Sequence, residues 1–415
     1  MRRVLLVLVA LLLLPGCGAV LPPTPTPTPV EITFSYSDSS LTGYYENAKK
    51  QFEAANPRLT VKLISSSPYG FFGSSGTNLD VAEIGQPFLA TLAKAGFLRA
   101  LDPILQGPDG LDLAEFSPGT VDACRWHGQL YALPLGVDPQ LLYYNRDLFD
   151  AAGVPYPSND WTWDDFLQAA QRIAMPDAQP PVYGFVSEGS FRSLDFLPFI
   201  YQGGGSVVDS AIDPKAATLS SDASVAALQW YVDLALSSKV MPTPQDLRGG
   251  GGLQTMVVSR RAAMWFGALS DRNGMAWGVP WNFNWGVVRQ PAGKQRVTLF
   301  SLRSVAINQK SEHLQPAWLW AKYLAEHPGG DYDLPALKVA MQSQNLLPAD
   351  PPAVREAATL AMENAQAFPS VSWLRDFVRE MDWAMNSIFS GDATVKDAMT
   401  KVDQDLNATI AQDSQ

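Results

Sequence analysis

The sequence predicts an α/β protein with two domains. Three observations support this fold class. Strand-like and helix-like segments alternate along the first part of the chain, the 415 residues are too many for one hydrophobic core, and the chain ends in helical patterns. Alternating strands and helices fold into a largely parallel sheet with helices on both faces.

The first elements follow one another closely from residue 30. Residues 30–37 (VEITFSYS) alternate as a strand does, and residues 42–55 form a helical pattern that ends before Pro57. Strands are expected at 59–65 and 79–85, with a helix after the second. Ligands of such sheets bind beyond the carboxyl ends of the strands. The candidate ligand residues there are Ser37, Asp38, Ser39, Gln86 and Phe88.

The later segments are mainly helical. Thr162, with Asp165 three residues later, matches an acidic capping box and predicts the start of a helix. Residues 191–205 suggest a helix closed by glycines. Near the chain end, residues 372–389 and 392–410 each place apolar side chains on one helical face, which predicts two amphipathic helices.

The N-terminal residues predict export. Arg2 and Arg3 precede an apolar run that is too short for a membrane span, so residues 1–16 fit a signal peptide. The run ends LLPGC, which resembles the lipobox of bacterial lipoproteins and implies lipidation of Cys17. Residues 17–30, rich in Pro and Thr, are expected to form an extended tether that holds the body away from the outer face of the cell membrane.

The composition argues against several classes of function. The chain has 30 basic and 41 acidic residues, and removing the signal makes it more acidic, which disfavours nucleic acid and anionic lipid as partners. With Cys17 lipidated, Cys124 has no partner for an intramolecular disulfide. The histidines do not have the spacing of a metal site, and we expect neither a metal nor another cofactor.

Several segments together resemble one family, the extracellular solute-binding lipoproteins of carbohydrate ABC importers, of the maltose-binding type. The match is spread over most of the chain. It rests on LDVAEIGQPFLATLAKAGFLRALD, LYALPLGVDPQLLYYNRDLFDAAGVPYP, TWDDFLQAAQRIA, SRRAAMWFGAL and ATVKDAMTKVDQDLNATI, in this order.

The resemblance implies a two-lobed periplasmic-binding-protein-like fold whose lobes, each a mostly parallel sheet flanked by helices, are joined by hinge crossovers. It places residues 31–135 and 268–326 in the first lobe, and residues 136–267 and 327–415 in the second. The segment 130–149 would then cross the hinge, with Asp138 facing the cleft. The residues agree, because a wholly buried strand would not hold an Asp-Pro at its centre.

A sugar site needs hydrogen-bonding groups for hydroxyls and flat rings for C–H faces. Asp38, Gln86 and Asp138 are the polar candidates, and Phe88, Trp265 and Trp281 are the rings, although any one Trp could equally be packed in the core. Because strand side chains alternate, at most one of Tyr143 and Tyr144 points at the cleft, and Tyr143 is the candidate. Gly267 would allow close approach of a backbone.

One loop departs from the family. Where relatives commonly have a glycine-rich turn and often a Trp, this chain has LFSLRSVAINQKS, with Ser301 and Arg303. Arg303 either pairs with a carboxylate of the protein or binds a carboxylate or phosphate of the ligand. The second alternative would make the ligand an acidic sugar.

The resemblance implies a protein that captures a sugar or oligosaccharide by closure of its lobes and delivers it to an ABC permease. It implies no catalysis, and we expect a monomer. Other interpretations remain open at this point. The same fold could bind a glycerol-phosphate compound, a sugar acid or a polyamine. A surface glycosidase with two carboxylates or an adhesion scaffold is also compatible with the composition.

Overall fold

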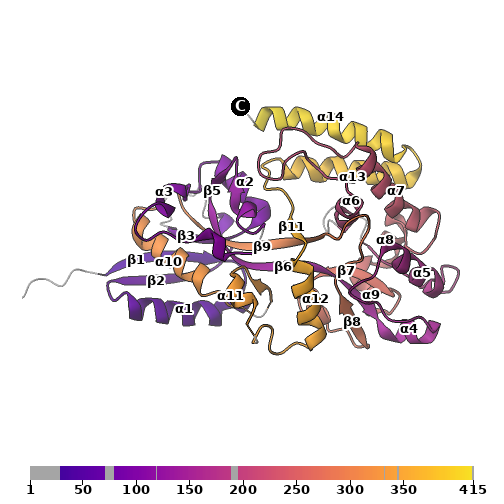
Figure 1. The fold of residues 1–415 in the computed structure, drawn as a ribbon, viewed down its shortest axis with the longest axis horizontal. Coiled ribbons are helices and arrows are strands. Elements are labelled where there is room, and N and C mark those ends of the chain that lie inside the picture. The colour runs from indigo at the N-terminus through magenta and orange to yellow at the C-terminus, as the bar shows by residue number, and fades with distance from the viewer. Residues whose placement is uncertain are drawn as a thin grey trace, which may run out of the picture.

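The computed structural model describes residues 29–70, 79–117, 119–187, 195–330, 332–343 and 345–413. Two lobes lie side by side and are joined by long strands that run from one to the other (Figure 1). Their apolar side chains form two large buried clusters. The predicted two-lobed α/β class is therefore confirmed. Cys17, the signal peptide and most of the tether lie outside the described residues.

The first lobe is built on the sheet that the alternating pattern predicts. β1 pairs in parallel with β2 over its whole length and with β3 near its carboxyl end. The sequence places Tyr45, Ala48, Phe52 and Ala55 on one face of the helix α1; the first three are buried against this sheet, whereas Ala55, the last residue of the helix, is exposed. The elements special to this lobe are β1 (Val30–Tyr36), α1 (Thr42–Ala55), β2 (Leu59–Ser65), β3 (Val81–Gly85), α2 (Gln86–Lys94), α3 (Asp102–Leu105), β4 (Arg125–Trp126), β5 (Gln129–Leu130) and α10 (Leu314–Glu326).

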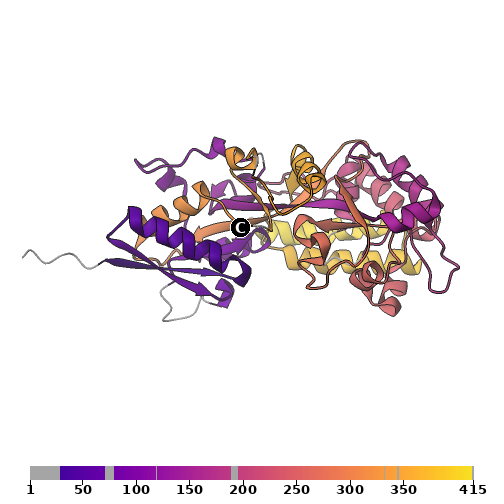
Figure 2. The same cartoon turned by 90° about the horizontal axis from the view of Figure 1, so that it is seen from below.

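Three strands cross between the lobes. β6 (Ala132–Asn145) is continuous, and its first half pairs with β9 (Thr298–Ile307) while its second half pairs with strands of the second lobe. β9 in turn pairs antiparallel with β3 and parallel with the short β11 (Ala365–Ala367). In the view from below, these strands run along the middle of the molecule and connect its two bodies (Figure 2).

In the second lobe, β7 and β8 pair antiparallel with residues 140–145 of β6, and parallel bridges join Tyr183 to Ala262 and Val186 to Trp265. Thr162 and Asp165 form the predicted capping box at the start of α5. The elements of this lobe are α4 (Arg146–Ala152), α5 (Trp163–Ile173), α6 (Leu197–Gln202), α7 (Asp222–Leu236), α8 (Pro244–Gly250), α9 (Gly252–Val258), β7 (Met264–Ala268), β8 (Trp285–Val288), α13 (Leu374–Ser390) and α14 (Val395–Asp413).

The predicted lobe boundaries need two corrections. Residues 268–326 were assigned to the first lobe, but β8 pairs with the second-lobe half of β6. Residues 327–415 were assigned to the second lobe, but β10 (Leu334–Pro335) pairs with Gly136 and Val137 in the first-lobe half. The sequence pattern of a strand does not identify its partner, so these errors could not be seen in advance. The segment after β10 carries α11 (Lys338–Met341) and α12 (Pro352–Met362).

Within the residues that the structure describes, none of the helices is long and apolar enough to cross a bilayer.

Candidate functional site

Asp138 lies on β6 where that strand leaves the first lobe. Its carboxylate contacts the second lobe, because Oδ1 accepts a hydrogen bond from the backbone N–H of Ser270 at 3.0 Å and Oδ2 accepts one from the Ser270 hydroxyl at 2.6 Å. Ser270 is the second residue of the short 3-10 segment after β7 (Leu269–Gly274). The predicted hinge residue therefore does lie between the lobes.

The surroundings of Asp138 disfavour its charged form. Burial raises the pKa of its carboxyl to about 7, and the two hydrogen bonds from Ser270 act in the opposite direction. The nearby carboxylates of Asp333 and Asp271 raise this pKa further. Near neutral pH, Asp138 can therefore carry a proton or release it in response to a new hydrogen-bond donor.

The Arg303 side chain makes all of its hydrogen bonds to other groups of the protein. Its Nε donates to the Asp333 carboxylate at 2.9 Å, and one terminal nitrogen donates to the same carboxylate at 3.2 Å and to the Gly329 carbonyl at 3.1 Å. The other terminal nitrogen donates to the Tyr45 hydroxyl at 3.1 Å and to the Glu83 carboxylate at 3.4 Å. A guanidinium has five N–H donors, and these contacts use all of them. Of the two predicted roles for Arg303, the structure shows the ion pair with carboxylates of the protein.

The Arg303–Asp333 pair depends on a glycine in β6. Gly136 is the register partner of Arg303, and Asp333 lies directly over it, so that a Cβ at Gly136 would collide with the Asp333 carboxyl group. Gly136 is required because the Asp333 side chain approaches it closely, and not because its backbone conformation is unusual.

The predicted aromatic residues lie in the interior. Tyr143, Trp265 and Trp281 have almost no exposed surface and pack on one another with ring centroids 5.0 to 6.0 Å apart. The Tyr143 hydroxyl donates to the carbonyl of Ala268 at 2.9 Å. The prediction that these rings offer a surface to a ligand is therefore wrong for this structure, because they form the core beneath β6 and β7.

Gly267 also has a packing role. A Cβ there would lie 3.2 Å from both the Tyr143 ring and the Asp271 carboxylate, so the backbone approaches these groups and not a ligand.

Gln86 joins the first lobe to the third crossing segment. It is 3% exposed, and its amide donates to the Phe368 carbonyl at 2.7 Å and to the Ser370 hydroxyl at 3.0 Å. Its predicted contact with ligand hydroxyls is wrong for this structure, because the amide N–H groups are already bound in the interior.

The remaining predicted residues are accessible. Ser37, Asp38 and Ser39 follow β1 and are exposed, although Asp38 accepts a hydrogen bond from Ser40 N–H at 2.9 Å. Phe88 is 49% exposed and packs against Tyr69 with ring centroids 4.3 Å apart. These side chains have free surface at the strand ends, and their ligand contacts stay predictions.

Ser301 is also exposed and is the register partner of Asp138 on β9. Opposed residues of an antiparallel pair share one face of the sheet, so these two polar side chains project together. This pairing makes Asp138 and Ser301 the polar centre of the candidate site.

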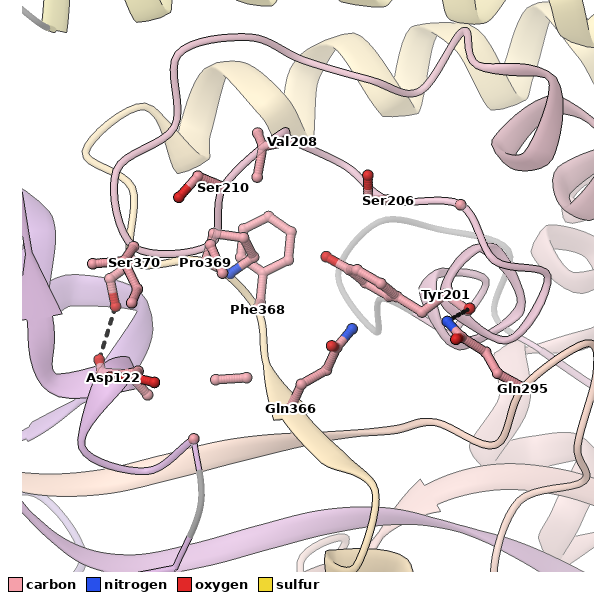
Figure 3. Close-up of a pocket in the computed structure, with 16 residues that line it drawn as sticks. Asp122, Tyr201, Ser206, Val208, Ser210, Gln295, Gln366, Phe368, Pro369 and Ser370 are labelled. Carbon is pink, nitrogen blue, oxygen red and sulfur yellow. Dashed lines mark hydrogen bonds between the residues drawn. The ribbon is translucent and has the colours of Figure 1, made fainter. Parts of the chain in front are cut away.

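A separate cavity of about 440 Å³ lies between the lobes beside β11 (Figure 3). Tyr201, Ser206 and Gln295 line it from the second lobe, and Asp122 lines it from the first. None of the twelve predicted ligand residues lines this cavity. Gly119 also lines the cavity, and a Cβ built at Gly119 would lie 3.8 Å from the ring of Phe300. Phe300 and Ser301 are neighbours on β9, so their side chains project from opposite faces of this strand. The cavity therefore lies on the other face of β9 from Ser301.

Two side-chain contacts join the lobes outside this cavity. His127 in the first lobe lies 2.9 Å from Asp213 in the second, measured from Nδ1 to a carboxylate oxygen. Lys94 at the end of α2 pairs with Asp413 at the end of α14 at 2.6 Å. Both pairs join a first-lobe side chain to a second-lobe side chain.

Sequence reasoning missed three polar residues around Asp138. Ser270 and Asp271 directly follow β7, so the rule about strand ends could have identified them. Asp333 lies in an irregular segment before β10 and has no comparable signal. Within the described ranges, no group of His, Cys, Asp and Glu side chains could hold a metal ion.

A family model described as bacterial extracellular solute-binding protein matches residues 38–331. The chain belongs to this family. The match begins after β1 and ends before β10, so it includes the crossing strands β6 and β9 but not β11, α13 or α14. It confirms the predicted resemblance to solute-binding proteins, which are not enzymes.

Individual relatives agree over nearly the full length. A putative binding protein of Brucella abortus is 26% identical and covers 88% of this chain and 90% of its own. An ABC substrate-binding protein of Listeria monocytogenes in complex with cycloalternan has a TM-score of 0.74 at 24% identity, over 92% of this chain and 99% of its own. A cyclic α-maltosyl-1,6-maltose binding protein of Arthrobacter globiformis has a TM-score of 0.76 at 19% identity, over 92% and 99%. These two structures share the fold of this solute-binding protein.

Proposed function

We propose that this solute-binding protein captures a carbohydrate between its lobes and delivers it to an ABC permease. The observation that carries the proposal is the position of Asp138, a carboxyl group on a strand that crosses between the lobes, in contact with Ser270 of the second lobe. A carboxylate that accepts hydroxyl hydrogen bonds is an efficient sugar-binding group. The names of the cycloalternan and maltosyl-maltose binding proteins support the same ligand class.

Capture would proceed by rotation of the lobes about the three crossing strands. Asp138 and Ser301 would bind hydroxyl groups at the hinge, while Ser37, Asp38, Ser39 and Phe88 would contact the ligand from the first lobe. We also propose that Cys17 is lipidated and that the tether anchors the protein to the outer face of the cell membrane. Delivery to a permease requires such an extracytoplasmic location.

A thermal-shift screen of the purified chain against mono- and oligosaccharides, sugar alcohols and polyamines tests the proposal. A ligand at about 100 times its dissociation constant should stabilise the protein by about 2.7 kcal/mol. Calorimetry should then give one site per chain, and chromatography of the mixture should recover the sugar unchanged. Stabilisation by polyamines alone, or cleavage of the sugar, would contradict carbohydrate capture.

A further inference from the structure

The hinge carries an excess of negative charge. Several ionisable side chains gather around the start of the second-lobe half of β6 and are named here the hinge cluster. Its members are Glu83, Asp138, Asp271, Asp333, Asp350, Arg272 and Arg303. The carboxyl groups outnumber the guanidinium groups, so the cluster is net negative when its carboxyl groups are ionised.

Neither arginine of the hinge cluster is available to an anionic ligand. All five N–H donors of Arg303 are used within the protein. Arg272 is 2% exposed, and it donates to Asp350 at 2.7 Å and to the carbonyls of Leu269 and Tyr332 at 3.0 and 3.1 Å. A carboxylate or phosphate entering near Asp138 would therefore meet negative charge without a compensating cation.

We propose that the cleft accepts uncharged polyhydroxy ligands and rejects those that carry a carboxylate or phosphate group. This inference rests on the proposed function, because it assumes that ligands bind beside Asp138. A neutral hydroxyl can donate to the Asp138 carboxylate, which has lone pairs left beyond its two bonds from Ser270. An ionised carboxylate or phosphate group of a ligand has no hydrogen to donate, and it is repelled by Asp138, Asp271 and Asp333 in a region of reduced dielectric constant.

Matched pairs of sugars test the charge selectivity directly. Glucose is compared with glucuronate, and maltose with maltobionate, by isothermal titration of the purified chain at pH 8, where Asp138 is mostly ionised. The neutral member of a pair that binds should do so at least about tenfold more tightly than its carboxylate partner, which corresponds to about 1.4 kcal/mol. Equal or tighter binding of the carboxylate would overturn the inference and leave carbohydrate capture standing.

A low-pH titration separates charge from size. Between pH 8 and pH 5.5 Asp138 gains a proton, whereas the carboxylate of the sugar acid stays ionised, so the preference for the neutral sugar should narrow severalfold. A preference that depends only on the bulk of the extra oxygen would not change with pH, and that result would overturn the inference. If no sugar of the thermal-shift screen binds, the carbohydrate proposal itself is contradicted, and this inference falls with it.

Two variants complete the experiment. Asp138→Asn removes the charge beside the ligand and should make the selectivity independent of pH. Asp392→Asn removes the same charge from an exposed residue between α13 and α14, which is not a member of the hinge cluster, and should leave the wild-type pH dependence in place. A pH-dependent selectivity that persists in Asp138→Asn would assign the effect to another residue.

Discussion

The Asp138→Asn variant should make the unliganded protein more stable at alkaline pH. The pKa of Asp138 is about 7 in the folded protein, against an ordinary value of 3.8. Between these two pH values the folded protein keeps a proton that the unfolded chain has released. The free energy of unfolding therefore falls as the pH rises through this window, and above about pH 7 the ionised carboxylate imposes its full cost.

The size of this cost follows from the difference between the two pKa values. About 3 pH units at about 1.4 kcal/mol each give about 4 kcal/mol. The Asp138 side chain keeps some contact with solvent, which reduces the cost, so we expect about 2 to 4 kcal/mol. Asparagine has nearly the same shape, can still accept the hydrogen bond from Ser270 N–H, and has no charge to bury.

Urea unfolding followed by tryptophan fluorescence at pH 4.5 and pH 8 measures the effect. The variant should unfold close to the wild type at pH 4.5 and at clearly higher urea concentration at pH 8. The Asp392→Asn protein is the control for removing one negative charge. A difference between Asp138→Asn and wild type that is the same at both pH values would refute the reasoning, because it would show that burial of the charge is not the cause.

Three further substitutions test other parts of the structure. Gly136→Ala should lower the free energy of unfolding by about 2 to 4 kcal/mol in urea, because the new methyl group displaces the Asp333 carboxylate from Arg303. A loss below about 1 kcal/mol would show that this ion pair can shift at little cost in stability. Gln86→Leu should cost about 1 to 3 kcal/mol in the same assay, since the buried Phe368 carbonyl loses its donor, and unchanged stability would contradict this linking role. Lys94→Ala should cost no more than about 1 kcal/mol, because the Lys94 side chain is half exposed. A loss above about 2 kcal/mol by thermal unfolding would mean that its contact with Asp413 holds the lobes together.

The fold could be predicted from local patterns where those patterns decide the structure. The alternation at residues 30–37 and 59–65, the face of α1 and the capping box at Thr162 all give the elements that the structure contains. The partner of β8 could not be predicted, because pairing depends on distant residues that the strand itself does not encode.

The candidate site could be predicted only in part. Asp138 was identifiable because an Asp-Pro is unusual inside an apolar strand. The same reasoning failed for Trp265 and Trp281, because a large ring can fill a core or line a site, and only the packing around it distinguishes the two. For Arg303, both alternatives were visible in the sequence, but its partner Asp333 is 30 residues away in an irregular segment.

The place where the chain enters the first lobe has a mechanical consequence. Val30 begins β1 at the outer end of that lobe, away from the second lobe (Figure 1). A pull applied before Val30 enters the sheet at β1, which is separated from the crossing strand β9 by β3. When the second lobe carries no opposing load, such tension leaves the hinge unloaded and the second lobe free to rotate. A load attached to α14 would instead be transmitted through the crossing strands and would resist or assist their bending.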